Sequence, residues 1–165
     1  MLQFIVNMPY ILEVILTKIV DEKILYKKVE LDISNKSDNP DDLALLLVQK
    51  HNTDIIEKNR LISHSTSWRY VPTGSTIITY IVYSDDFDFG QSDISTLNIS
   101  DINIIQSGDP SRPAPKEISL SSVVSHGIRH LSFLVTNNPS VYSSTINSNT
   151  LLRFKEIDAA LAGKI

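Results

Sequence analysis

The stretch Ile77-Ile78-Thr79-Tyr80-Ile81-Val82-Tyr83 carries the strongest structural signal in the sequence. Its residues are β-branched or aromatic on both alternating faces, which is typical of a strand that is buried on two sides. Residues 60–70 form a second extended segment, and Pro72-Thr73-Gly74 between the two supplies residue types that turns favour. The sequence therefore predicts a hairpin of residues 60–70 and 76–84, with its second strand inside a sheet.

Two further extended segments precede this hairpin, at residues 11–20 and 23–33. From Lys28 to Ile33, charged and apolar residues alternate, which indicates a strand with one solvated face. Asp21-Glu22 stands between the two segments and is expected to turn a hairpin. Four strands are thus expected in two hairpins.

Three segments have the features of helices. Asn39 or Asp38 can cap a helix over residues 40–51, which has a proline in its first turn. From Ser119 the apolar residues follow helical spacing until Asn137-Asn138-Pro139, and a last helix is expected over residues 149–161. Gly127 lies inside the second helix, where glycine usually marks a close approach, and we expect that helix to pack against the central strand.

Residues 85–117 are expected to be mostly loop, with a short strand at Ile102 to Ile105. The predicted element order is β-β-α-β-β-(β)-α-α within a single domain of residues 1–165. Short turns between adjacent strands favour an antiparallel or mixed sheet with helices packed over it. The predicted fold class is therefore α+β.

Composition excludes several classes of protein. The chain has 165 residues, a formal net charge of -4 and no cysteine. Nucleic-acid binders usually have a basic face, so we expect no nucleic acid as a partner. The apolar N-terminal twenty residues are interrupted by Asn7, Pro9, Glu13 and Lys18, so we expect neither a membrane span nor a secretory signal. These features, with the absence of cysteine, predict a cytoplasmic protein.

The first polar motif runs from His64 to Tyr70. On a regular strand, alternate residues share a face, so two groups are expected: His64, Thr66, Trp68 and Tyr70 on one face, and Ser63, Ser65, Ser67 and Arg69 on the other. The first group suits the floor of a small pocket. The second places hydroxyls beside a guanidinium, which suits a carboxylate or a phosphate. Alternatively, these are ordinary strand residues and Trp68 is a large core side chain.

The second polar motif is His126-Gly127-Ile128-Arg129-His130. Histidines four residues apart lie on one side of a helix and can bind Zn²⁺, Ni²⁺ or Cu²⁺. A zincin would have glutamate where Gly127 stands, and a third ligand is needed, for which His64 is the best candidate. We expect no metal and no cofactor, and keep His64, His126 and His130 as the metal candidates. The alternative is a pair of boundary histidines hydrogen-bonded to neighbouring strands.

Three segments together resemble a family of small bacterial proteins of unknown function: the strand His64-Ser65-Thr66-Ser67-Trp68-Arg69, the strand Thr79-Tyr80-Ile81-Val82, and the helix with His126 and Ile128-Arg129-His130-Leu131. The resemblance covers roughly residues 40–165. It implies no activity, only that the two motifs can be considered together.

A fainter likeness is to a degenerate Nudix-like fold, through the helix at 40–51 and the two strands that follow it. The Nudix family needs glutamates on its helix to hold Mg²⁺, whereas this helix carries leucines at positions 45–47 and acids only at Asp41 and Asp42. The usual pyrophosphate hydrolysis is not expected.

We expect a protein that binds a small anionic ligand or a protein partner, with catalysis left open. The alternative is a metal-assisted or Nudix-like hydrolase. A homodimer through the apolar N-terminal segment is a further alternative. The expected ligand-binding residues are His64, Ser65, Ser67, Trp68, Arg69, His126, Arg129 and His130.

Overall fold

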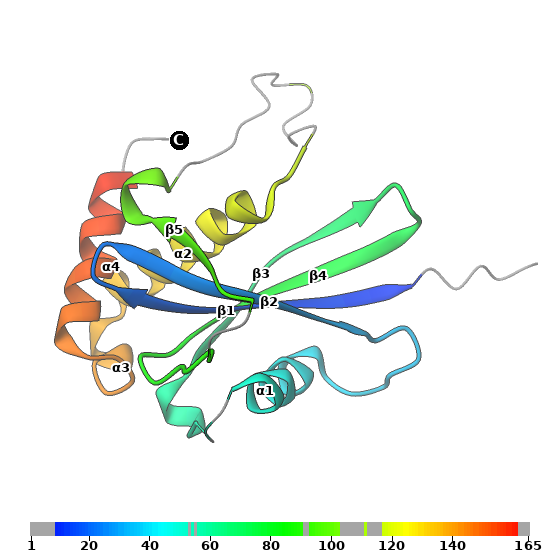
Figure 1. The fold of residues 1–165 in the computed structure, drawn as a ribbon, viewed down its shortest axis with the longest axis horizontal. Coiled ribbons are helices and arrows are strands. Elements are labelled where there is room, and N and C mark those ends of the chain that lie inside the picture. The colour runs from blue at the N-terminus through cyan, green and yellow to red at the C-terminus, as the bar shows by residue number, and fades with distance from the viewer. Residues whose placement is uncertain are drawn as a thin grey trace, which may run out of the picture.

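The computed structural model describes residues 9–161, except 53, 55, 91–92, 103–110 and 112–116. It is an α+β fold, as predicted, with a five-stranded mixed sheet and helices on both faces (Figure 1). The strands are β1 (Tyr10–Val20), β2 (Lys23–Asp32), β3 (Ile62–Val71), β4 (Ser75–Tyr83) and β5 (Ser95–Asn98). The α-helices are α1 (Pro40–His51), α2 (Leu120–Asn137), α3 (Pro139–Tyr142) and α4 (Ser148–Leu161), and 3-10 turns lie at Lys58–Arg60 and Ile99–Asp101.

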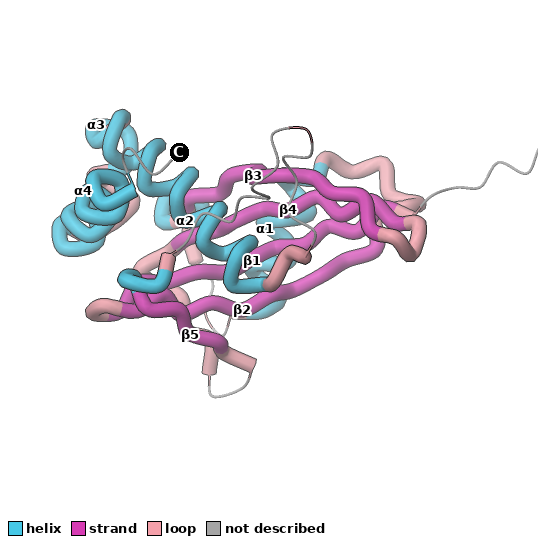
Figure 2. The backbone as a smooth tube through the Cα atoms, turned by 90° about the horizontal axis from the view of Figure 1, so that it is seen from above, coloured by secondary structure: helices cyan, strands magenta, loops and turns pink. Residues whose placement is uncertain are grey.

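Two antiparallel hairpins form most of the sheet. The strand order is β3-β4-β1-β2-β5, which Figure 2 shows from above. β1 pairs with β2 and β3 pairs with β4 antiparallel, and the two hairpins join through a parallel pairing of β1 with β4. The predicted second strand of the β3–β4 hairpin is therefore an inner strand, and β3 is an edge.

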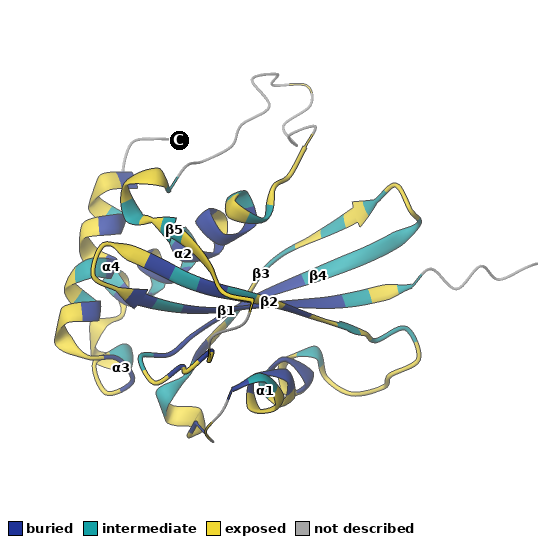
Figure 3. Ribbon diagram, viewed as in Figure 1, coloured by how far each residue is buried: buried dark blue, intermediate teal, exposed yellow. Residues whose placement is uncertain are grey.

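Each face of the sheet has its own apolar core, because alternate residues of the inner strands point in opposite directions. On one face, Leu12 and Val14 of β1 pack with Leu43 and Leu47 of α1. On the other face, Ile15 of β1 and Ile81 of β4 pack with residues of α2 and α4. Figure 3 shows that burial is concentrated where these helices cover the sheet, and that the outer end of the β3–β4 hairpin is more exposed.

The helix boundaries follow the capping signals. Asn39 caps α1 by accepting a hydrogen bond from the backbone N–H of Asp41, and Ser119 caps α2 by accepting one from Ser122. The strand predicted at Ile102 to Ile105 lies mostly outside the described residues. β5 lies inside the segment that was expected to be loop. None of the helices in the described part of the chain is long and apolar enough to cross a membrane.

Gly127 is where α2 touches the sheet. A Cβ atom at this position would lie 2.6 Å from Cδ1 and 3.2 Å from Cβ of Ile81. Ile81 is only 1% exposed, so its side chain has little room to move aside. The predicted close packing of this helix on the central strand is confirmed, and it depends on the absence of a side chain at Gly127.

Gly127→Ala is expected to destabilise the protein, although alanine is the better helix former. Alanine gains roughly 1 kcal/mol in helix propensity. Overpacking a tight contact costs roughly 1–3 kcal/mol, and the larger cost is expected here because Ile81 is fully enclosed. Urea denaturation of Gly127→Ala should show a lower free energy of unfolding.

Ile81→Val removes the Cδ1 atom that the new Cβ would meet, and it is the matched control. The double variant Gly127→Ala with Ile81→Val should be more stable than the two single losses added together. If Gly127→Ala alone stabilises the protein, the close contact of α2 with the sheet is refuted.

Candidate functional site

A β-bulge at Thr66 changes which side chains of β3 share a face. Ser65 lies opposite Tyr80 and Ser67 lies opposite Thr79, so Thr66 is an extra residue in β3. An extra residue reverses the alternation beyond it. His64 and Arg69, which regular alternation predicted on opposite faces, therefore both face the α2 side, and that sequence-based face assignment is wrong.

His64 meets α2 through His130. His64 Nε2 and His130 Nδ1 are 3.3 Å apart and share a hydrogen bond, and the ring centroids are 5.4 Å apart. The ring of His126 lies 4.4 Å from that of His130 but is itself exposed. His64 pairs with Ile81 across the hairpin, and Gly127 packs directly on Ile81. Since His130 follows Gly127 by about one helical turn, the close contact of α2 with the sheet places His130 next to His64.

Burial keeps this histidine pair uncharged. Desolvation lowers the pKa of His64. Desolvation also lowers the pKa of His130 to about 4, with further lowering by His126, His64 and Arg129. Near neutral pH both rings are therefore neutral, and one donates its N–H to the lone pair of the other. Whichever ring donates, the two outer nitrogens, Nδ1 of His64 and Nε2 of His130, present one donor and one acceptor.

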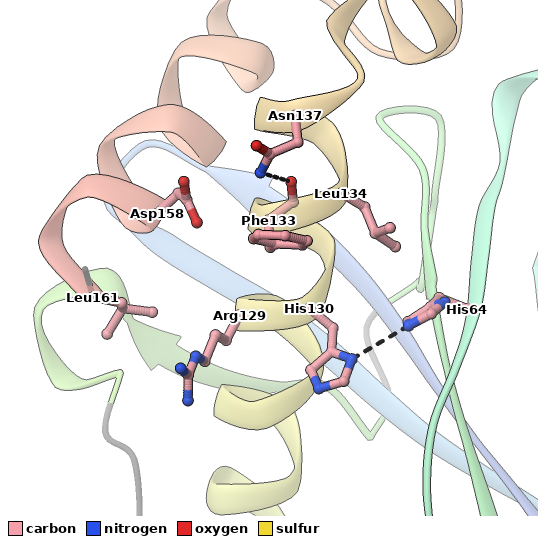
Figure 4. Close-up of a pocket in the computed structure, with 8 residues that line it drawn as sticks. All are labelled: His64, Arg129, His130, Phe133, Leu134, Asn137, Asp158 and Leu161. Carbon is pink, nitrogen blue, oxygen red and sulfur yellow. Dashed lines mark hydrogen bonds between the residues drawn. The ribbon is translucent and has the colours of Figure 1, made fainter. Parts of the chain in front are cut away.

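The histidine pair lies in the wall of a pocket of about 780 Å³ between β3, α2 and α4 (Figure 4). The pocket is lined by His64, Arg129, His130, Phe133, Leu134, Asn137, Asp158 and Leu161. This volume is within the range of small-molecule sites. Figure 4 shows Asp158 on α4 and Arg129 on α2 on the same side of the exposed Phe133 ring, while Asn137 donates to the carbonyl oxygen of Phe133.

Arg129 is the one cation in the lining of this pocket. Within the part of the chain that the structure describes, it has neither a hydrogen bond nor an ion pair, whereas Arg60, Arg69 and Arg153 are all paired with carboxylates. Its charge is therefore available to a ligand.

The structure divides the eight predicted site residues between three places. His64, Arg129 and His130 line the pocket above, and His126 contacts it only through the His130 ring. Ser65, Ser67 and Trp68 line a separate hollow at the outer end of the hairpin. Arg69 belongs to neither.

Arg69 forms an ion pair with Glu13 instead of presenting its charge to an anion. Its two terminal nitrogens lie 3.0 and 2.9 Å from the carboxylate oxygens of Glu13. Thr79 accepts from Arg69 at 2.8 Å and donates to Glu13 at 2.9 Å. The Glu13 side chain is 2% exposed and that of Arg69 is 22% exposed. The predicted role of Arg69 in binding a ligand is not available to it while this pair is formed.

The metal candidates do not form a site of the kind that metals need. Among the residues that the structure describes, no group of three or more His, Asp or Glu side chains is placed to hold a metal ion. His64 and His130 face each other through ring nitrogens that bond to one another. The two nitrogens that face each other are thus engaged in a hydrogen bond.

The sequence analysis missed residues of the pocket and the carboxylate that pairs with Arg69. Asp158 and Asn137 reach the pocket from helix positions that look like ordinary solvated ones. Glu13 left a signal, because it interrupts an otherwise apolar run in a strand. A single carboxylate in such a run indicates a buried ion pair, and Arg69 was the available partner one hairpin away.

Glu13→Ala is expected to destabilise the protein by about 3 kcal/mol, at the low end for breaking a buried ion pair because Arg69 reaches solvent. Chemical denaturation measures the loss. Glu13→Leu combined with Arg69→Leu removes both charges and should remain close to the wild type in stability. A loss below about 1 kcal/mol in Glu13→Ala would contradict the assignment, since exposed pairs contribute that little.

The His130 ring is expected to stay neutral well below the ordinary range of histidine. A pH titration followed by ¹H–¹⁵N NMR of the imidazole nitrogens should give a midpoint for His130 at about 4, because desolvation and neighbouring positive charge lower its pKa. His126→Gln should raise that midpoint. The unfolded chain takes up this proton near the ordinary histidine pKa of 6.5, so stability should fall as the pH is lowered from 6.5 towards 4. A wild-type midpoint near 6.5 would contradict the half-buried His64–His130 pair.

The chain was compared with protein-family models and with curated proteins. No protein-family model matches the chain. No curated protein matches it either. What the site does is therefore argued from its own residues.

Proposed function

We propose that this protein binds a small anionic ligand in the pocket lined by His64, Arg129 and His130. The observation that carries the proposal is the position of Arg129, a cation without a protein partner in the described residues, beside a neutral histidine pair in a pocket of about 780 Å³. A guanidinium presents several N–H groups that match a carboxylate or a phosphate. Arg129 is half-buried, and such an interaction is stronger there than at a fully exposed surface.

The histidine pair supports this ligand class. When His64 donates to Nδ1 of His130, the outer nitrogen of His130 carries a proton and can donate to the anion beside Arg129. The pair can supply this donor without becoming charged. The apolar side chains of Phe133, Leu134 and Leu161 provide contact surface for the rest of the ligand.

Asp158 limits which anions fit. Its carboxylate lines the same pocket as Arg129, from α4 (Figure 4). A ligand with negative charge at both ends would be repelled there. We therefore expect a ligand with one anionic group, whose other end is neutral or carries a hydrogen-bond donor.

The proposal assigns binding and no reaction. The hydrolase alternative needs a metal or a general base beside a nucleophile, and no group of His, Asp or Glu among the described residues is placed to hold a metal. We place this binding in the cytoplasm, where a chain without cysteine has no need of an oxidising compartment.

A thermal-shift panel tests the proposal, with small carboxylates, sugar monophosphates and nucleotides as probes. A ligand at a hundred times its dissociation constant adds about 2.7 kcal/mol, which should raise Tm by roughly 5–10 °C. We expect a shift from a singly anionic probe that weakens as salt is added and is lost in Arg129→Gln.

Lys155→Gln is the matched control, because Lys155 is an exposed cation on α4 and its loss changes the net charge equally. It should keep the full shift. A panel in which no anion changes Tm, or a shift that survives in Arg129→Gln, would refute the proposal.

A further inference from the structure

A second hollow lies on the opposite face of the sheet, beyond the part that α1 covers. Its volume is about 530 Å³ and its lining comes from β1, β3 and β4, including Tyr10, Trp68, Thr76 and Ile78. Ile78 packs at the border of the apolar core beneath α1, which identifies the face. The anionic-ligand pocket lies on the other face of the sheet, between β3 and the helices α2 and α4.

Aromatic side chains are unusually exposed around this hollow. Trp68 is 75% exposed, Tyr70 is 58% exposed and Tyr10 is 44% exposed. Trp68 is also the single tryptophan of the chain. Large apolar side chains gathered in one exposed area usually mark a binding surface, because leaving them in water forfeits the free energy of burial.

The sheet register sets the distance between the aromatic walls. Trp68 on β3 lies opposite Ile78, Tyr10 on β1 lies opposite Thr76, and β4 runs between them. The outer strands of such a trio are roughly 9.5 Å apart, two strand spacings. A ring in van der Waals contact on both faces needs about 3.5–4.0 Å on each side. Because Ile78 and Thr76 are two residues apart on β4, Trp68 and Tyr10 are also offset along the strands by roughly 6.8 Å and lie roughly 12 Å apart on the diagonal. The hollow therefore accommodates a ring that stacks on Trp68 above Thr76 and Ile78, with Tyr10 at the far side of that ring.

The polarity of the lining restricts the chemistry of that ring. None of the described residues that line this hollow is charged. Arg69, the nearest guanidinium along β3, is bound to Glu13 on the other face. A phosphate or a carboxylate would find no cation here, so nucleotides and organic acids fit poorly.

Hydroxyl groups provide the polar contacts instead. Besides its aromatic residues, the hollow is lined by Ser65, Thr66, Ser67 and Thr76. The Thr76 hydroxyl makes no hydrogen bond to another described residue and can both donate and accept, whereas the Thr66 hydroxyl already donates to the carbonyl oxygen of Thr79 and is left to accept. Sugar hydroxyls have the same dual capacity, and the C–H bonds of a sugar ring carry the slight positive charge that the negative face of an aromatic ring attracts.

We infer that this hollow binds a neutral sugar ring, stacked on Trp68 and facing Tyr10, with its hydroxyls bonded to the serine and threonine hydroxyls of β3 and β4. This site goes beyond the proposed function and does not depend on it. Binding requires no change in the backbone, because the aromatic walls are already exposed on strands that flank β4.

Trp68 fluorescence tests the inference directly, because this one tryptophan is at the site. Wild-type protein is titrated with glucose, galactose, mannose, N-acetylglucosamine and disaccharides of these sugars. We expect a saturable blue shift with at least one saccharide, unchanged by added salt. The affinity should fall about tenfold or more in Tyr10→Ala and in Thr76→Val, which keep the fluorophore.

Phe133→Ala is the matched control, because Phe133 is 59% exposed and lines the other pocket. Phe133→Ala should bind the saccharide as the wild type does. Arg129→Gln should abolish anion binding and leave saccharide binding unchanged, so each of the two proposals can fail without the other. The inference is overturned if no saccharide shifts the emission, or if Tyr10→Ala and Thr76→Val bind as well as the wild type. It is also overturned if the Trp68 emission shifts with protein concentration alone and the protein has the mass of two chains in solution. That result would mean that a second copy covers the hollow.

Discussion

The contact between Gly127 of α2 and Ile81 of β4 is the constraint on which the arrangement of this protein depends. A side chain at position 127 would overlap Ile81, which is fully enclosed, so helix and sheet can approach this closely only through glycine. His64 is paired with Ile81 in the sheet, and His130 follows Gly127 by about one helical turn. The close contact therefore determines the histidine pair, and the histidine pair forms one wall of the pocket. A more distant helix would leave two unrelated surface histidines.

Much of the fold could be predicted because its signals are local. The apolar run of β4, the Asn39 and Ser119 caps and the glycine in α2 each act within a few residues of their own position. The bulge at Thr66 could not be predicted, since nothing in a run of serines and threonines indicates where an extra residue is inserted. That single insertion separates Trp68 from His64. The sequence motif that looked like one site is therefore divided between the two faces of the sheet.

The pairing of the strands also decides which arginine is neutralised by a carboxylate. Arg69 and Arg129 both belong to predicted motifs, yet one is neutralised by the buried Glu13 and the other has no partner among the described residues. Sequence could not distinguish them, because the partner of Arg69 is 56 residues away and reaches it only through the parallel pairing of β1 with β4. Near neutral pH, the described residues of the candidate anion site thus provide the Arg129 cation and two neutral rings, with the Asp158 carboxylate in the same lining. The hollow on the opposite face has no charged side chain among the lining residues that the structure describes.

The central claim is that α2 holds His130 against His64, and a double-mutant cycle on stability tests it most directly. The free energy of unfolding is measured at a pH of about 7.5, where both rings are neutral, for wild type, His64→Ala, His130→Ala and the double variant. Residues that share a part-buried hydrogen bond should show a coupling energy of about 0.5–1.5 kcal/mol, so the double variant should lose less than the two single losses added together. Additive losses, with a coupling energy near zero, would contradict the account, because the two rings would then not be in contact.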